Sequence, residues 1–396
     1  MRVFHSNEGH PLTSTLPATQ GETYIAAPAD ADVAVAAEPR ARGVAYLTAL
    51  DGMRGLAAFI VLSAHVAVFF NLPLALGWLG THAYLAVDCF FVMSGFVMAH
   101  AFDDKLKAGM TVRDFALHRF LRLYPLVLAG VIFGAISLLG YCATTPGVPK
   151  LAVVEAIVSG ALLVPTDVLA KYKAYDFPVN IAFWSLSFEV LLCLGYGVFG
   201  RFLTGWRMVA ALVVSACGIV YLGEQKAGLD IGFRVGEYGP AFCRVIYPFL
   251  MGIFLRRLPA FAPARTNLGY LALPLLLLLL VNPLPMNGVY DAVAVVAGIP
   301  LLVWMAATAR SLPRVDALAA GAGALSYPLY ALHFPIVVML ANVGKKLKVD
   351  DAENLSLAMA GILISISVAA LVYNGYDKPF RAWLRKKLPF SSPKWS

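Results

Sequence analysis

The chain has 396 residues, of which 60% are apolar and 14% are charged, and 31 Lys and Arg residues against 23 Asp and Glu residues give a formal net charge of +8. Soluble domains carry about 25% charged residues, so this composition, with a mean hydropathy of +0.75, excludes a soluble enzyme. The long, nearly charge-free runs are each close to the ~20 residues that an α-helix needs to cross a bilayer. We therefore expect an all-α integral membrane protein.

The excess of basic residues does not indicate a nucleic-acid partner. These residues stand in short loops between apolar runs, as the positive-inside bias of membrane proteins predicts. The five cysteines form no C-x-x-C pair, so we expect neither a disulfide framework nor a metal site.

The first 45 residues lack the apolar core of a signal peptide and are rich in Ala, Pro and Thr. They predict a disordered cytoplasmic tail over 1–45. A membrane domain is expected over 46–385, followed by a short cytoplasmic tail over 386–396.

Apolar runs then follow one another along the chain, and eleven of them are candidate spans: 55–74, 84–102, 123–142, 151–165, 183–200, 208–223, 238–255, 267–283, 288–309, 325–343 and 355–375. The run at 151–165 is short for a crossing. If it does not cross, nearly all basic loops lie on the side of the N-terminal tail, so we predict ten spans with both termini cytoplasmic. The cluster Lys345, Lys346 and Lys348 is the exception, because it falls outside.

The first span carries polar groups that hydrocarbon does not tolerate unpaired. Asp51 and Arg54 stand at its cytoplasmic start, and His65 follows eleven residues after Arg54. At ~1.5 Å per residue His65 lies about 16 Å deeper and on the same helix face. Alone, Arg54 is explained as a snorkelling anchor and His65 as a helix-to-helix hydrogen bond. Together on one stripe they indicate a site.

The next two spans add further candidates. Asp88 lies in the second span, with Ser94 and Gly95 one to two turns deeper; Gly95 is more readily explained by close helix packing than by chemistry. Arg119 and Arg122 are three residues apart on one helix face, immediately before the third apolar run. Two guanidinium groups there suit a phosphate-bearing ligand, although an interfacial anchor has the same sequence.

Two later motifs complete the set of candidates. In F-W-S-L-S-F-E, Glu189 follows Trp184 and Ser185 into an apolar run, where a carboxylate needs a cationic or imidazole partner. In Y-P-L-Y-A-L-H-F-P, His333 stands between aromatic residues in the ninth span. Structural and functional explanations of His333 are equally good.

Seven motifs in order resemble the acyltransferase 3 family of membrane acyltransferases. They are the R-x10-H spacing after L-D-G, F-F-V-M-S-G-F, R-F-L-R-L-Y-P, W-S-L-S-F-E, R-V-I-Y-P-F-L-M-G, Y-P-L-Y-A-L-H-F-P and D-K-P-F-R-A-W-L, and they cover about 48–385. Asp377 stands where the family more often has Glu, and Met93 where Leu is usual.

The resemblance implies a ten-helix enzyme that takes an acyl group, usually acetyl, from cytoplasmic acyl-CoA and passes it to a hydroxyl of a carbohydrate or lipid-linked glycan. It also implies that His65 and Arg54 are essential, and that Arg119, Arg122 and Glu189 fall on family motifs. No metal is implied. The inner membrane is the expected location.

A mechanism can be assigned to these residues as a hypothesis. An imidazole, with an unperturbed pKa near ~6.5, suits a general base or an acyl relay, so His65 would activate the acceptor hydroxyl and Glu189 would hold the tautomer of His65. The donor contacts would be Arg54, Arg119, Arg122, Asp51 and Ser94. The acceptor contacts would be Trp184, Ser185, His333 and Asp88, with the segment 151–182 on the outer face.

A polytopic transporter or flippase is the alternative class, because such proteins also place ionisable groups at mid-membrane. Transporters are usually built from repeated halves. The R-x10-H motif has no counterpart later in this chain, which favours the enzyme.

Overall fold

A computed structural model describes residues 47–72, 81–258 and 266–387 of the chain. The predicted N-terminal tail over 1–45 and the last nine residues of the predicted C-terminal tail lie outside the described residues. The described residues are helical, with two isolated β-bridges, Tyr175 to Arg234 and Thr266 to Ala309.

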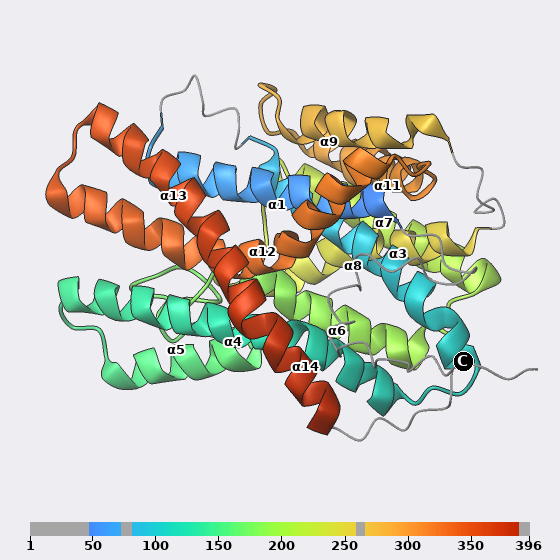
Figure 1. The fold of residues 1–396 in the computed structure, drawn as a ribbon, viewed down its shortest axis with the longest axis horizontal. Coiled ribbons are helices and arrows are strands. Elements are labelled where there is room, and N and C mark those ends of the chain that lie inside the picture. The colour runs from blue at the N-terminus through green and yellow to red at the C-terminus, as the bar shows by residue number, and fades with distance from the viewer. Residues whose placement is uncertain (1–46, 73–80, 259–265, 388–396) are drawn as a thin grey trace, which may run out of the picture. The chain divides into compact units, whose positions relative to one another are not determined.

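The helices follow the predicted apolar runs in order (Figure 1). They are α1 (Thr48–Phe69), η3 (Ala83–Leu85), α3 (Ala86–Lys107), α4 (Val112–Thr144), α5 (Lys150–Leu162), α6 (Phe183–Phe199), α7 (Gly205–Lys226), α8 (Tyr238–Arg257), η5 (Asn267–Leu271), α9 (Ala272–Leu280), α10 (Gly288–Val293), η6 (Ala294–Gly298), α11 (Ile299–Ala307), α12 (Pro313–Leu347), α13 (Asp351–Val372), η7 (Tyr373–Asp377) and α14 (Lys378–Lys387).

Eight helical segments in the described part of the chain are long and apolar enough to cross a membrane, and two shorter apolar helices cover Phe183–Phe199 and Leu268–Leu280. This is consistent with the predicted all-α architecture of about ten spans. Helix α5 has only 13 residues. At 1.5 Å per residue it reaches about 20 Å, which is short of the ~30 Å hydrocarbon core.

The lateral order of the helices determines which motifs meet. Helix α1 packs along α12, and α12 also packs against α4 and α13. Helix α3 packs along α8, and α6 lies against α3, α4 and α8. In Figure 1, α4 and α5 run side by side in green, below α1 and α12. The polar residues of α1 therefore face those of α12, whereas those of α6 face α3 and α4.

Helices α3 and α8 touch backbone to backbone through a pair of glycines. A Cβ atom added to Gly95 would lie 2.0 Å from the carbonyl oxygen of Phe249, and one added to Gly252 would lie 2.0 Å from that of Val92. Only residues without a side chain allow this approach, a device common in membrane helices. The packing explanation of Gly95 is thus confirmed.

A proline ties α12 to the start of α6. Pro335 has no backbone N–H, so the carbonyl of Ala331, one turn earlier, loses its helical donor. The fully buried Asn180 supplies a donor instead, with its Nδ2 2.8 Å from the Ala331 oxygen. The Oδ1 atom of Asn180 accepts from the backbone N–H of Ala182, at the beginning of α6. This one amide places the W-S-L-S-F-E motif beside the Y-P-L-Y-A-L-H-F-P motif.

The connection between α5 and α6 holds a buried carboxyl group. Asp176 is 6% exposed, its backbone pairs with Thr166 and Phe233, and its Oδ2 is buried without a partner among the described residues. Burial, with a smaller contribution from the nearby Glu237, raises the pKa of Asp176 from 3.8 to about 6.

We expect Gly252→Ala to disrupt the membrane domain, because its new methyl group would push α8 away from the backbone of α3 over the full contact. The measurement is the yield of monodisperse protein after detergent extraction. Gly239→Ala, on the same helix with no atom within 4 Å of the added Cβ, is the matched control and should behave as the parent. Equal yields of both variants would contradict the close contact.

Stability should depend on pH through Asp176. Below about pH 4 the Asp176 carboxyl is mostly protonated in both the folded and the unfolded chain. Between pH 3.8 and about 6 it ionises in the unfolded chain but stays protonated in the folded chain, so a rise in pH lowers the free energy of unfolding. Asp176→Asn removes this loss in the free energy of unfolding, which is about 1–3 kcal/mol. The variant should melt above the parent at pH 7, and the difference should vanish near pH 4 in thermal unfolding. Glu224→Gln, at an exposed carboxylate, is the control.

Candidate active site

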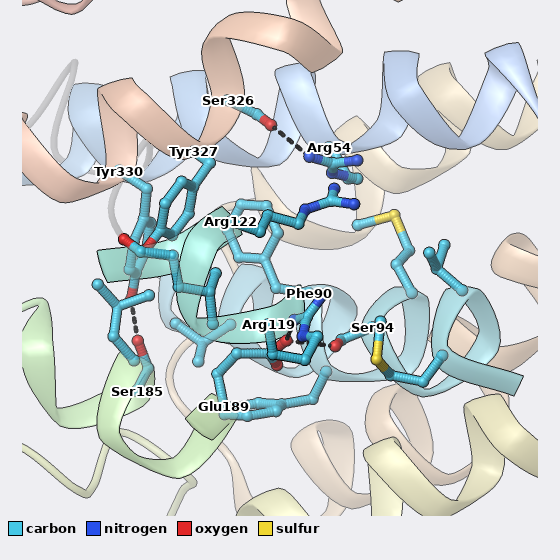
Figure 2. Close-up of a pocket in the computed structure, with 17 residues that line it drawn as sticks. Arg54, Phe90, Ser94, Arg119, Arg122, Ser185, Glu189, Ser326, Tyr327 and Tyr330 are labelled. Carbon is cyan, nitrogen blue, oxygen red and sulfur yellow. Dashed lines mark hydrogen bonds and ion pairs between the residues drawn. The ribbon is translucent and has the colours of Figure 1, made fainter. Parts of the chain in front are cut away.

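A cavity of about 130 Å³ lies between α1, α3, α4, α6 and α12 (Figure 2). Arg54, Arg119 and Arg122 lie on one side of it, and Ser185 and Tyr330 lie on the other (Figure 2). Its polar lining residues are Arg54, Ser94, Arg119, Arg122, Ser185, Glu189, Ser326, Tyr327 and Tyr330, and its apolar ones include Phe90, Phe91, Met93 and Leu186. The structure thus brings together six of the eleven predicted site residues.

Arg54 reaches the cavity from α1 and is held from two sides. One terminal nitrogen lies 3.1 Å from Oδ1 of Asp51, three residues earlier on the same helix. The other donates to Ser326 Oγ of α12 at 3.3 Å. The predicted donor contact Asp51 therefore orients Arg54 and does not itself line the cavity.

Glu189 is bound by Arg119, and the pair is mostly buried. The guanidinium Nη2 of Arg119 lies 2.6 Å from Glu189 Oε1, and their side chains are 8% and 15% exposed. The same oxygen accepts from Ser94 Oγ at 2.6 Å and from the Cys193 thiol at 3.4 Å. Three donors thus converge on one carboxylate oxygen of Glu189. The Nε of Arg119 is buried without a partner among the described residues.

Arg122 differs from its neighbour three residues earlier. It borders the cavity, its side chain is exposed, and it makes no hydrogen bond or ion pair with any residue that the structure describes. The cavity thus has three guanidinium groups, of which Glu189 and Asp51 neutralise two. The remaining positive charge is available to an anion.

Two hydroxyl groups are paired on the side of the cavity away from the arginines (Figure 2). Ser185 Oγ donates to the backbone oxygen of Ala182 and lies 2.6 Å from the hydroxyl of Tyr330, which therefore donates to it (Figure 2). The Tyr330 ring lies 5.9 Å from the ring of His333, centroid to centroid. His333 thus neighbours a lining residue but does not itself line the cavity.

Two histidines meet directly beyond Tyr330. Nε2 of His333 lies 3.3 Å from Nδ1 of His65, and that Nδ1 lies 2.9 Å from the backbone oxygen of Val61. His333 is 1% exposed, whereas His65 is only half-buried and packs against the rings of Phe69 and Phe334. His65 is thus less deeply buried than His333.

The predicted contact between Glu189 and His65 is wrong. The hydrogen bonds of Glu189 lead to Arg119, Ser94 and Cys193, and those of His65 lead to Val61 and His333. The reason is the arrangement of the helices: α6 packs against α3 and α4, whereas α1 packs against α12. The sequence predicts how deep a residue lies along its own helix, but it does not predict which helices are neighbours.

Two predicted acceptor contacts lie outside the cavity. Asp88 is fully buried and receives Nε and Nη2 of Arg244 at 3.2 and 2.6 Å. Arg244 also donates to the backbone oxygens of Ile231 and Tyr84, so the buried pair is saturated. Trp184 is buried with its ring 5.4 Å from the Arg244 guanidinium. The structure thus places Asp88 and Trp184 in contact with Arg244 and not at the cavity, which His333 does not line either.

Sequence reasoning overlooked Arg244, Tyr330 and Asn180. A signal for Arg244 was present, because an arginine inside the apolar run 238–255 requires a carboxylate, and Asp88 is one of few at that depth. Tyr330 lies three residues before His333, on the same helix face. Asn180 carries no such signal, because its task arises only from the carbonyl that Pro335 leaves free.

Comparisons with known proteins find a family and relatives for this chain. Residues 47–374 match the model of a family described as an acyltransferase domain. The chain is 23% identical over 380 residues to the acyltransferase MdmB of Streptomyces mycarofaciens, covering 88% of this chain and 95% of that protein. It is 35% identical over 177 residues to protein 2 in the picA locus of Rhizobium radiobacter, covering 42% and 89%. No solved structure matches the chain.

Breaking the Arg119 to Glu189 pair from one side should be costly. Arg119→Gln leaves a carboxylate without its cation, which costs about 3 kcal/mol in buried pairs. The double variant Arg119→Gln with Glu189→Gln removes both charges and should recover most of the thermal stability. Arg122→Gln, on the same helix but without a partner, is the control and should melt within about 0.5 kcal/mol of the parent. Additive losses in the double variant would contradict the pairing.

Proposed function

The chain belongs to this acyltransferase family, and on that premise we propose that it is a membrane-embedded O-acyltransferase that moves an acetyl or related acyl group from acyl-CoA to a hydroxyl of a carbohydrate or lipid-linked glycan. Family membership favours this transfer over a transporter or flippase. We further propose that the enzyme resides in the cytoplasmic membrane with both termini in the cytoplasm, as the distribution of basic loops favours.

The donor is assigned to the charged end of the cavity. Acyl-CoA carries phosphates at one end and a neutral thioester at the other. Arg122 has no hydrogen bond or ion pair among the described residues, and Arg54 and Arg119 line the same cavity. The Nε of Arg119 is also without a partner in the described part of the chain. Guanidinium groups bind phosphate oxygens by charge-assisted hydrogen bonds. Glu189 would keep Arg119 in place, and not act on the reacting atoms.

The observation that carries the proposal is the unequal distribution of charged groups over the cavity lining. Arg54, Arg119 and Arg122 lie on one side of the cavity, and Ser185 and Tyr330 lie on the other (Figure 2). Apolar side chains such as Phe90 and Leu186 form part of the walls, and the Tyr330 ring neighbours that of His333, which contacts His65. A pantetheine arm is likewise charged at one end, largely neutral along its length and reactive at the other end, so in this proposal the thioester passes the Tyr330 ring to reach His65.

The reaction follows from the free nitrogen of His65. Its Nδ1 faces the carbonyl of Val61, so Nδ1 carries the hydrogen and Nε2 has the lone pair. Nε2 takes the proton of the acceptor hydroxyl while the oxygen attacks the thioester carbonyl carbon. The C–S bond then breaks, the proton passes from Nε2 to the leaving sulfur, and an ester and the free thiol result. An acyl relay would use the same Nε2 as the nucleophile.

The acceptor is assigned to the other side of His65. The segment 163–182 is tied to the loop before α8 by backbone hydrogen bonds from Asp176 to Phe233 and from Val235 to Ala174. Asn180 and Ser185 connect this segment to α12, which carries His333, and His333 contacts His65 of α1. In this proposal the alcohol reaches His65 from the side of this segment and the donor reaches it from the side of the arginines.

Two substitutions test the assignment with labelled acetyl-CoA and membranes that contain candidate glycans. His65→Ala should lower kcat by about 10²–10⁴-fold, because it removes the base, with KM for acetyl-CoA nearly unchanged. Arg122→Ala should raise KM for acetyl-CoA about 10–100-fold, because it removes a charge-assisted phosphate contact, and should change kcat little.

His118→Ala is the matched control, because His118 is an exposed histidine of α4 that does not line the cavity, and full transfer is expected. Mass spectrometry of the glycans and immunoblotting for membrane insertion are the measurements. Undiminished acetylation by correctly inserted His65→Ala protein would end the proposal.

A further inference from the structure

We propose that His333 is a positioning residue whose Nε2 accepts the Nδ1 hydrogen of His65 and holds the imidazole of His65 in one orientation during acyl transfer. This rests on the proposed function of His65, and it assigns to a histidine the place that a carboxylate takes in many catalytic triads. Two helices are involved, because His65 belongs to α1 and His333 to α12.

The positions of the hydrogens follow from the partners. Nδ1 of His333 lies 3.0 Å from the backbone oxygen of Leu329 and 2.9 Å from that of Tyr330. Carbonyl oxygens only accept, so this Nδ1 must carry a hydrogen. In the neutral ring Nε2 is then an acceptor, and it lies 3.3 Å from Nδ1 of His65. If that Nε2 carried a hydrogen as well, it would point at the hydrogen on His65 Nδ1, and no hydrogen bond could form between the two rings.

The surroundings leave His333 no other arrangement. Its side chain is 1% exposed, so solvent cannot compete for its nitrogens. Its Nδ1 is shared by two carbonyls of its own helix, which fixes the ring relative to α12. The Tyr330 ring lies 5.9 Å away on the side of the cavity. The lone pair of Nε2 therefore points at His65 and at nothing else that the structure describes.

Val61 cannot perform the same task, although its oxygen also accepts from His65 Nδ1. Val61 and His65 belong to one helix, so this bond selects the tautomer but does not fix the ring relative to the cavity walls. His333 links the ring to α12, which also carries Tyr330 and Ser326 of the cavity. When His65 gains a proton on Nε2, the Nδ1 hydrogen becomes more acidic and both acceptors stabilise the cation.

The test compares two amides of different length. Glutamine reaches as far as the imidazole Nε2 and offers an oxygen to His65, whereas asparagine reaches only as far as Nδ1. We expect His333→Gln to keep kcat for acetyl transfer within about 5-fold and His333→Asn to lower kcat about 10–100-fold, with KM for acetyl-CoA unchanged in both. Equal kcat values for the two variants, or a loss confined to KM, would overturn the assignment.

A spectroscopic measurement does not depend on activity. In ¹⁵N-histidine-labelled parent protein in lipid, at alkaline pH, His333 should show one protonated nitrogen, Nδ1, and one unprotonated nitrogen, Nε2, with its signals assigned by their loss in His333→Gln. A protonated Nε2 of His333 would overturn the inference even if acetyl transfer is found. The expected pattern in a chain without transfer activity would instead overturn only the proposed function.

Discussion

A buried charge in a membrane protein must be compensated by a partner, and the pair of Arg119 and Glu189 is the compensation on which the cavity depends. Their contact of 2.6 Å joins α4 to α6 and, through Ser94, to α3. Because Glu189 neutralises the charge of Arg119, Arg122 is the cavity arginine that has no ion pair with any described residue. The difference between two arginines one turn apart is thus a difference in neighbours and not in residue type.

The cavity is polarised because its walls come from helices that face one another at different levels. Arginines enter it from α1 and α4, whereas the hydroxyl pair of Ser185 and Tyr330 comes from α6 and α12. A ligand with one charged and one neutral end has only one favourable orientation in such a space. The same polarity keeps the histidine pair away from the guanidinium groups, whose charge would oppose the imidazolium that forms on His65.

Small residues, and backbone carbonyls without a helical hydrogen-bond donor, determine which helices are neighbours. Gly95 and Gly252 bring α3 and α8 into backbone contact, and the carbonyl freed by Pro335 is bound by Asn180 at the start of α6. The saturated pair of Asp88 and Arg244 joins α3 to α8 at a further point. These contacts lie outside the cavity, yet they place Tyr330 beside Ser185 and Glu189 beside Arg119.

The membrane character, the approximate number of helices and the cavity residues Arg54, Arg119, Arg122, Ser94, Ser185 and Glu189 could be predicted from the amino-acid sequence. Hydropathy and 3.6-residue spacing report the depth and face of a residue within its own helix, so these features could be predicted. The interaction partners of these residues could not be predicted, because α1 lies beside α12, and contacts between helices far apart in the chain are not encoded in the spacing within one helix. The pairing of Glu189 with Arg119, of Asp88 with Arg244 and of His65 with His333 is therefore visible only in the tertiary structure.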